Sequence, residues 1–467
     1  AKISLNLPTL NPYIPDDFTL VKPEKKYPHP ELLVQEPGLR VLYMPSKYFA
    51  DEPRADLTLV LRNPQAMDSA KNQVLFALND YLAGLALDEL AGQAAVGGIS
   101  FSTNANSGLM VNANGYTQRL PQLLSELMKG YFSYTPTQEQ LDQAKSWYTR
   151  MLDSAEKGKA YEQAIMPVQM LSQVPYFQRA DRRAQLKGIT LKEVLTWRDS
   201  LRRNALPELL VLGNMAPQKA TELGRQLREQ LGTQGSEWCR SRDVLVDKAR
   251  RILIEKAGSS TDSALAALFV PTGYSEEASG AMSSMLAQII QPWFYNQLRT
   301  NEQLGYAVFA FPMSVGRQWG IGFLLQSSDR QPAALWQRYG AFFQNVEQRL
   351  RKMPPAEFAQ IKQGVINQFM QAPQTLNEEA TRLSKDFDRG NMNFDSRRKV
   401  VDEIRKLTPQ QLADFYRQAV MEHSGVALLS QIAGSQGKAD YASPEGWERE
   451  SDIHKLQKTF PLVSDKP

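Results

Sequence analysis

The chain has 467 residues, of which 42% are hydrophobic and 22% charged, and its formal net charge is +4. This length and ordinary composition are typical of a globular protein of about two to four domains. The charge is too balanced for a nucleic-acid-binding protein, which would carry a clustered basic face. The sequence has no run of about 18 apolar residues, so no membrane-spanning segment is predicted.

The first predicted elements follow a proline-rich opening. Residues 1–30 hold six of the 27 prolines, which disfavours helix and predicts an extended strap or linker. Alternating and helical apolar patterns then predict a series of elements. These are a strand at 54–61, a helix at 68–91, strands at 98–104 and 108–116, and helices at 118–133 and 137–157.

The same order of elements returns later in the chain. It comprises a strand at 264–270, a helix at 275–299, strands at 305–312 and 319–326, and a helix at 332–351. Pro64 and Pro271, which end the first strand of each series, lie 207 residues apart. The strings GGISF at 97–101 and GYAVF at 305–309 lie 208 residues apart. A chance similarity between two unrelated α+β domains remains the alternative.

We therefore predict an α+β protein with two homologous domains. The predicted boundaries are a linker or strap at 1–30, a first domain at 31–240, a second domain at 245–445, and a C-terminal tail at 446–467. The charged segment 237–251 is predicted to connect the two domains.

Few residues of this chain are suited to binding a metal. The three histidines are His29, His423 and His454, and no two have the spacing of helical metal ligands. Neither His-Glu-x-x-His nor the inverted His-x-x-Glu-His occurs. The single cysteine, Cys239, excludes an internal disulfide and a cysteine-based zinc site. We predict that this chain binds no metal and that the histidines lie on the surface.

The segment 289–312 is the richest in candidate site residues. Arg299 and Tyr306 flank a polar turn at 300–303, so both side chains are placed to face one pocket. Arginine donates to peptide carbonyls or carboxylates, and a tyrosine hydroxyl donates to an oxyanion. From these residues alone a plainer interpretation is favoured, in which the arginine pairs with an acid and the tyrosine packs in the core.

Two segments resemble the pitrilysin and insulin-degrading-enzyme family. Residues 298–309, LRTNEQLGYAVF, are similar to the signature of the family's C-terminal half. Residues 7–18, LPTLNPYIPDDF, resemble the segment that leads into that half. The resemblance covers nearly the whole chain and is closest to bacterial members. In that family, four α+β domains of the LuxS/processing-peptidase-like type form two bowl-shaped halves, and each domain is a mostly antiparallel sheet packed by helices.

The resemblance implies that this chain is the zinc-free C-terminal half of a zinc metalloendopeptidase that degrades small proteins and peptides. Zinc would be bound by the N-terminal half, through an inverted motif and a distal glutamate. This chain would close the chamber, and it would be inactive alone. Its partners would be the N-terminal half and peptide substrates, and its location the periplasm.

The resemblance also assigns roles to three residues. Tyr306 would donate to the substrate carbonyl oxygen as it becomes an oxyanion, Arg299 would hold the substrate backbone, and Tyr295 would be an aromatic substrate contact. Two other functions stay open. One is a stand-alone, non-catalytic subunit that binds peptides or a partner, and the other is a structural module without a peptide site.

Overall fold

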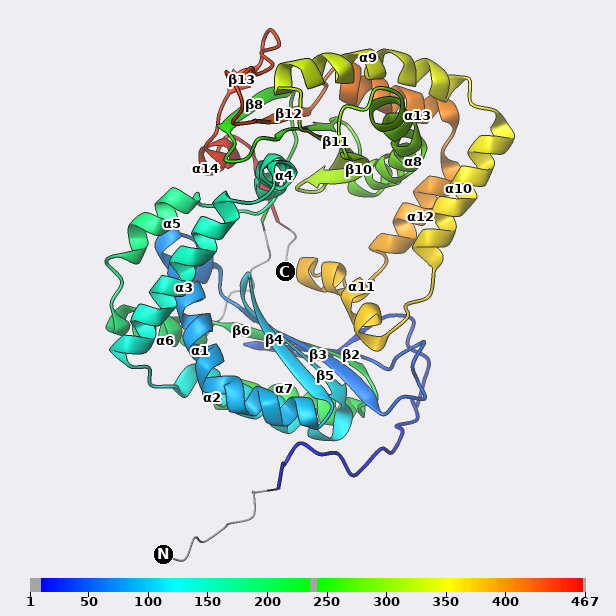
Figure 1. Ribbon diagram of the computed structural model, residues 1–467. Coiled ribbons are helices and arrows are strands. Elements are labelled where there is room, and N and C mark those ends of the chain that lie inside the picture. Colours follow the sequence, from blue (N-terminus) through cyan, green and yellow to red (C-terminus); the bar gives the residue numbers. More distant parts are fainter. Residues whose placement is uncertain (1–9, 236–241, 465–467) are drawn as a thin grey trace, which may run out of the picture.

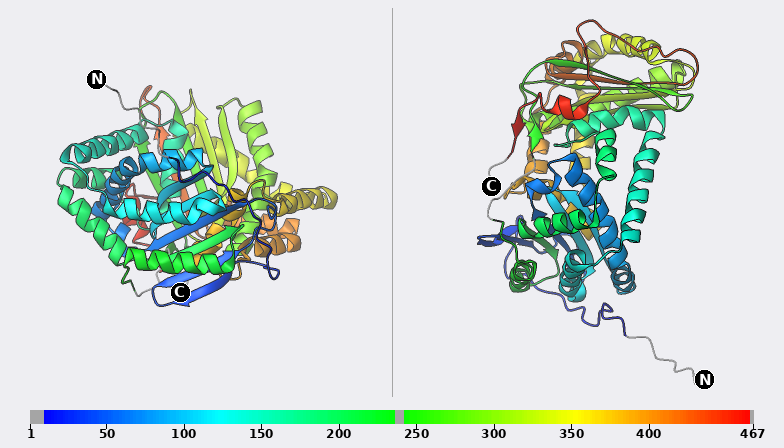
Figure 2. Two further views of the ribbon diagram at one scale, coloured as in Figure 1. Left: turned by 90° about the horizontal axis from the view of Figure 1, so that it is seen from below. Right: turned by 90° about the vertical axis from the view of Figure 1, so that its left-hand side faces the viewer.

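The computed structural model describes residues 10–235 and 242–464. The described chain contains two six-stranded sheets, which lie at opposite ends of the molecule (Figure 1). Figure 2 shows the same arrangement from two further sides, with helices packed along each sheet.

The first sheet has the strand order β1-β2-β6-β3-β5-β4. Its neighbours pair antiparallel except β2 and β6, which are parallel. The strands are β1 (Glu31–Glu36), β2 (Leu39–Met44), β3 (Arg54–Arg62), β4 (Ile99–Asn106), β5 (Gly108–Tyr116) and β6 (Leu206–Gly213).

The second sheet has the strand order β10-β11-β9-β12-β8-β13. Its strands are β8 (Arg250–Ala257), β9 (Ser263–Val270), β10 (Ala307–Val315), β11 (Gln318–Ser327), β12 (Val426–Ala433) and β13 (Glu448–Arg449). Five of them match β2, β3, β4, β5 and β6 in position, and β8 and β12 form the equivalent parallel pair. The predicted fold class, α+β with two homologous, mostly antiparallel sheets, is confirmed.

The helices also follow the repeated order. The first series is η1 (Pro64–Met67), α1 (Ala70–Val96), η2 (Thr117–Arg119), α2 (Leu120–Ser133), α3 (Gln138–Glu156), α4 (Ala160–Leu171), α5 (Arg179–Leu186), α6 (Leu191–Arg203) and α7 (Pro217–Leu231). The second is α8 (Glu276–Tyr295), η3 (Asn296–Asn301), α9 (Pro332–Arg351), α10 (Pro355–Met370), α11 (Leu376–Arg389), α12 (Ser396–Lys406), α13 (Pro409–Tyr416) and η4 (Arg417–Met421). Short elements β7 (Asp243–Val244), α14 (Ile453–Gln457) and β14 (Leu462–Val463) complete the described chain.

Capping residues explain why two equivalent helices begin where they do. Thr190 accepts a hydrogen bond from the backbone N–H of Glu193, whose side chain accepts from the backbone of Thr190. Thr408 and Gln411 form the same capping box at the start of α13. Each box satisfies two backbone donors that a helix start leaves unpaired. The repeat is therefore visible in local chemistry as well as in strand order.

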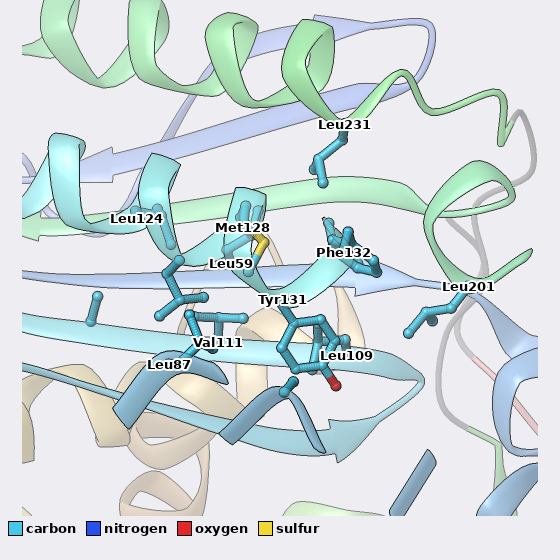
Figure 3. Packing of buried hydrophobic residues seen from close by; sticks show 14 of the residues in the cluster. Leu59, Leu87, Leu109, Val111, Leu124, Met128, Tyr131, Phe132, Leu201 and Leu231 are labelled. Atoms are coloured by element: carbon cyan, nitrogen blue, oxygen red, sulfur yellow. The ribbon is translucent and has the colours of Figure 1, made fainter. Parts of the chain in front are cut away.

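The main core of the first unit lies between its sheet and its own helices. Leu59 of β3 and Val111 of β5 meet Leu87 of α1 and Leu124 of α2, all almost inaccessible to solvent (Figure 3). An equivalent core lies on the corresponding face of the second sheet, where Phe323 packs among aromatic rings from α8 and α9.

The other face of each sheet is covered by a helix from the opposite unit. α4 follows the first sheet's helices in sequence, yet its Ala164 and Val168 pack with Leu268 of the second sheet. α11 comes from the second unit, yet its Phe387 packs with Val60 of the first sheet. Figure 1 shows both helices between the two sheets. Because α4 and α11 occupy equivalent places in the repeat, this is a reciprocal exchange, which the sequence did not predict.

Polar contacts reinforce the exchange. The buried Arg62 guanidinium pairs with Glu208 at 2.5 Å and donates to the carbonyl oxygen of Phe387 at 3.4 Å. The Glu379 carboxylate of α11 accepts from the Ser46 hydroxyl at 2.5 Å and from the Lys47 backbone at 3.0 Å. The two units are therefore joined by buried side chains as well as by the connecting chain.

Some expectations for the connecting segments need correction. Residues 236–241, which include Cys239, lie outside the described residues, but Arg250 and Arg251 begin β8. The C-terminal part of the predicted linker is thus a strand inside the second sheet. In the strap, residues 10–30 form no helix or strand, and Tyr13 is fully buried there. The proposed domain boundaries themselves stay a prediction.

Candidate functional site

The candidate site lies where α8 turns into the second sheet. α8 is capped by Ser275, whose side chain accepts from the backbone N–H of Ala278, and after Tyr295 it widens into the π-helical turn η3. Buried Phe294 and Leu298 anchor this helix end in the core. Such π-helical turns interrupt the regular α-helical hydrogen bonding, and they are frequent at functional sites.

The chain after η3 is held in a fixed path. Glu302 accepts two hydrogen bonds from the Arg338 guanidinium at 2.6 and 2.7 Å. Gln303 has a φ of 52°, a left-handed conformation that is uncommon for residues other than glycine. A Cβ on Gly305 would lie 1.8 Å from the carbonyl oxygen of Gln326, so only glycine fits there. The residue that follows, Tyr306, is therefore presented at the start of β10 by a tightly constrained backbone.

Tyr306 takes part in a small polar network. Its hydroxyl donates to Oδ2 of Asp262 at 3.0 Å and accepts from Nε2 of Gln326. The same Nε2 donates to Oδ2 of Asp262 at 2.6 Å, and Oε1 of Gln326 accepts from the backbone N–H of Tyr161 at 3.0 Å. Desolvation and the hydrogen bond to Asp262 both raise the pKa of the Tyr306 phenol. At neutral pH the phenol is therefore protonated and able to donate.

All three candidate residues expose their side chains. Tyr306 is 53% and Tyr295 40% exposed, and Arg299 is also exposed. Tyr295 and Arg299 are four residues apart across the junction of α8 and η3, which places them on neighbouring turns. Within residues 10–235 and 242–464, Arg299 forms no ion pair. The plainer interpretation, a paired arginine and a core tyrosine, is wrong for both residues.

Two members of the network were missed by sequence reasoning. Asp262 lies just before β9, and Gln326 is buried near the end of β11, after the apolar residues 323–325. The available signal was a glutamine directly after the apolar run 323–325, because a buried amide requires hydrogen-bond partners. The partners themselves are 20 to 165 residues away in the sequence.

The histidines are not simple surface residues, contrary to expectation. His29, His423 and His454 are each partly buried and lie against Phe394, Phe269 and Phe177, respectively. Burial, with a smaller contribution from the nearby Arg251, lowers the pKa of His423 to about 4.

The described residues offer no site for a metal ion and no membrane-spanning helix. They contain no group of three or more histidine, cysteine, aspartate or glutamate side chains placed to hold a metal ion. No helix in that part of the chain is long and apolar enough to cross a membrane.

Comparison with known proteins places the chain in a family. The sequence pattern of the middle or third domain of peptidase M16 matches residues 1–185, and that of C-terminal lobe domain 4 of PqqF-like PQQ synthase matches residues 285–384. Protease 3 of Escherichia coli K12 is 69% identical over 467 residues, which is 100% of this chain and 48% of the relative. The chain belongs to the peptidase M16 family.

Solved structures agree with this membership. The crystal structure of pitrilysin has a TM-score of 0.97 and 69% identity, covering 99% of this chain and 50% of that chain. A peptidase M16 inactive domain from Pseudomonas fluorescens has a TM-score of 0.62 at 12% identity, covering 89% of this chain and 100% of that chain, and supports the fold alone. This M16 chain spans about half the length of the curated relatives it matches.

Proposed function

We propose that this chain is the zinc-free C-terminal half of a zinc metalloendopeptidase that degrades small proteins and peptides. It closes the chamber over the active site and supplies residues that hold the substrate. The observation that carries the proposal is the 69% identity to half of Protease 3 over all 467 residues. The order of the matched patterns, a third domain followed by a fourth, favours the C-terminal half.

Tyr306 is proposed to donate a hydrogen bond to the substrate carbonyl oxygen as negative charge develops on it. Its raised pKa keeps the phenol protonated, and its 53% exposure leaves it accessible to a substrate. Such a donor stabilises the transition state more than the ground state, and so it raises kcat.

Arg299 is proposed to bind the substrate backbone. Its exposed guanidinium has no carboxylate partner within the described residues and so keeps its donors for a ligand. Tyr295, on the preceding turn, is proposed as an aromatic contact for a substrate side chain.

In the part of the chain that the structure describes, no group of side chains fits a zinc site, and the three histidines lie on separate segments, each against an aromatic ring. We propose that the zinc is bound by the N-terminal half, where it would polarise the carbonyl to be attacked. By resemblance to Protease 3, the assembled enzyme is proposed to act in the periplasm.

Separate expression of the two halves tests this function. The chain and an N-terminal half from a close relative are purified and assayed alone and mixed, with a fluorogenic peptide as substrate. We expect neither half to cleave the peptide alone and the mixture to cleave it. If the halves associate but remain inert, or if this chain binds peptides alone without any catalytic partner, the stand-alone binding subunit is the better description.

A further inference from the structure

Gln326 connects the candidate site to the exchanged helix α4. It is only 2% exposed and lies at the end of β11, on the sheet face that α4 covers. Its Oε1 accepts from the backbone N–H of Tyr161, the second residue of α4, at 3.0 Å. That N–H is one of the first four of the helix, which have no acceptor within the helix itself. The contact therefore fixes which way the amide of Gln326 points.

With its oxygen facing α4, the amide presents both hydrogens of Nε2 to the other side. One is donated to Oδ2 of Asp262 at 2.6 Å and one to the hydroxyl oxygen of Tyr306. A phenol that accepts at its oxygen still has its own hydrogen to donate. In the structure this hydrogen goes to Oδ2 of Asp262, 3.0 Å away. By donating to the phenolic oxygen, Gln326 orients Tyr306 as a hydrogen-bond donor. Asp262 accepts that hydrogen bond when no substrate is bound.

We propose that Gln326 is a positioning residue for Tyr306 and that Asp262 competes with the substrate for the phenolic hydrogen bond. This inference rests on the proposed function, in which Tyr306 donates to the substrate. As the carbonyl oxygen gains negative charge, it replaces Asp262 as the acceptor, while Gln326 continues to donate to the phenolic oxygen. Only hydrogen bonds are exchanged, and no proton changes its covalent partner.

The helix that holds the Gln326 amide, α4, is one of the two helices exchanged between the units. α4 belongs to the first unit by sequence but packs against the second sheet through Ala164 and Val168. The orientation of Gln326 therefore depends on the docking of a helix from the other unit. This explains why an amide is buried at the end of a strand, directly after the apolar residues 323–325.

Gln326→Glu is the sharpest test, because it keeps the shape and the acceptor for Tyr161 but removes both donors. The introduced carboxylate would accept the phenolic hydrogen and withhold it from the substrate. In the assembled enzyme we expect kcat to fall about 10- to 100-fold, somewhat less than for loss of an oxyanion donor itself, with KM changed less than twofold. In a Tyr306→Phe background the same substitution should change kcat less than twofold, since both act through one hydroxyl.

The pH profile separates positioning from simple damage. A protonated carboxyl has one hydrogen to donate where the amide has two, so the activity of Gln326→Glu relative to the parent should rise in part as the pH falls. A purely structural defect would not be relieved in this way. Gln363→Glu, an exposed glutamine on α10, is the matched control and should leave kcat unchanged.

Asp262→Asn gives an independent test should Gln326→Glu fail to fold. Removing the competing charge should raise kcat/KM about two- to tenfold, on the scale of one hydrogen bond. A fall in kcat/KM would overturn the assignment of Asp262.

Tyrosine labelled with 13C at Cζ reports on the network in this chain alone, with the Tyr306 resonance assigned from Tyr306→Phe. Both Gln326→Glu and Asp262→Asn should shift that resonance, whereas Gln363→Glu should not. If Tyr306→Phe itself leaves kcat unchanged, the proposed function fails, whatever the resonance does. If Tyr306→Phe lowers kcat but Gln326→Glu does not, or if their effects multiply, the positioning role is wrong.

Discussion

Asp56 is a buried carboxylate at the contact between the first sheet and α11, and it predicts a measurable dependence of stability on pH. The side chain is 2% exposed, and its hydrogen bond from Nδ2 of Asn377 is 3.2 Å long. Burial outweighs this bond and raises the pKa of Asp56 from 3.8 to about 6. The folded state therefore prefers the protonated carboxyl more strongly than the unfolded state does.

The free-energy cost of ionising Asp56 in the folded state follows from the difference between its folded and unfolded pKa values. A shift of roughly two pKa units corresponds to about 3 kcal/mol between the two protonation states. Below about pH 4 the carboxyl is neutral in both states, and the cost is absent. It grows as the pH rises from 4 to 6 and is fully present above 6, where both states are ionised.

Asp56→Asn removes this cost while keeping an acceptor for Asn377. Above pH 6 we expect it to raise the free energy of unfolding by up to about 3 kcal/mol, or roughly 6–12 °C in Tm for a cooperative unit of 150–250 residues. The gain should vanish toward pH 4. Calorimetry from pH 4 to 8 measures it, with Asp51→Asn, at an exposed turn position, as the control. Equal or lower stability of Asp56→Asn at pH 7.5 would refute the reasoning.

Other predictions concern packing and the turn before β10. Phe387→Ala should lower the free energy of unfolding by about 3–5 kcal/mol in denaturant titrations, because it empties the contact of α11 with the first sheet; a loss below 1 kcal/mol would contradict the exchanged packing. Gly305→Ala should abolish activity of the assembled enzyme and lower Tm, since its Cβ would overlap the Gln326 carbonyl oxygen. Gly340→Ala, with open space at that position in α9, should instead raise Tm slightly. Equal Tm values for the two glycine variants would contradict the conclusion that a Cβ at residue 305 clashes with the Gln326 carbonyl oxygen.

Much of the fold was predictable because the spacing of apolar residues within each segment indicates a strand or a helix. The alternation at 54–61 and the apolar run at 264–270 predicted β3 and β9 within one or two residues. Among the strands that were not predicted, β8 has the sequence RRILIEKA, in which charged residues at both ends hide a short apolar centre. Because of these charges, the segment was predicted to be a solvent-exposed connection between the two domains.

The exchange of α4 and α11 could not be predicted in the same way. Leu376, Ala380 and Phe387 have helical spacing, which indicates an apolar helix face. That spacing does not say which sheet the face will cover. The choice depends on contacts between residues more than 300 positions apart, such as Ser46 with Glu379.

The candidate site likewise contains residues that the sequence identified and residues that it did not. Arg299 and Tyr306 were singled out by their positions on either side of a polar turn, and the resemblance of their segment to a family signature then assigned their roles; the exposure of both fits a substrate-facing role. Asp262 and Gln326 carry no recognisable motif. Their importance appears only when the sheet brings β9, β10 and β11 together and α4 is placed across them.

We propose above that this chain supplies a hydrogen-bond donor, Tyr306, to an active site whose metal is bound by the N-terminal half. The most direct test of this proposal is the kcat of the reassembled enzyme with Tyr306→Phe, compared with Tyr48→Phe, whose ring is equally exposed at 53%. We predict a fall in kcat of about 10²- to 10³-fold, or somewhat less if the zinc shares the charge, with little change in KM. Tyr48→Phe should leave both parameters unchanged. Unaltered kcat in Tyr306→Phe, with the two halves associated, would contradict the account.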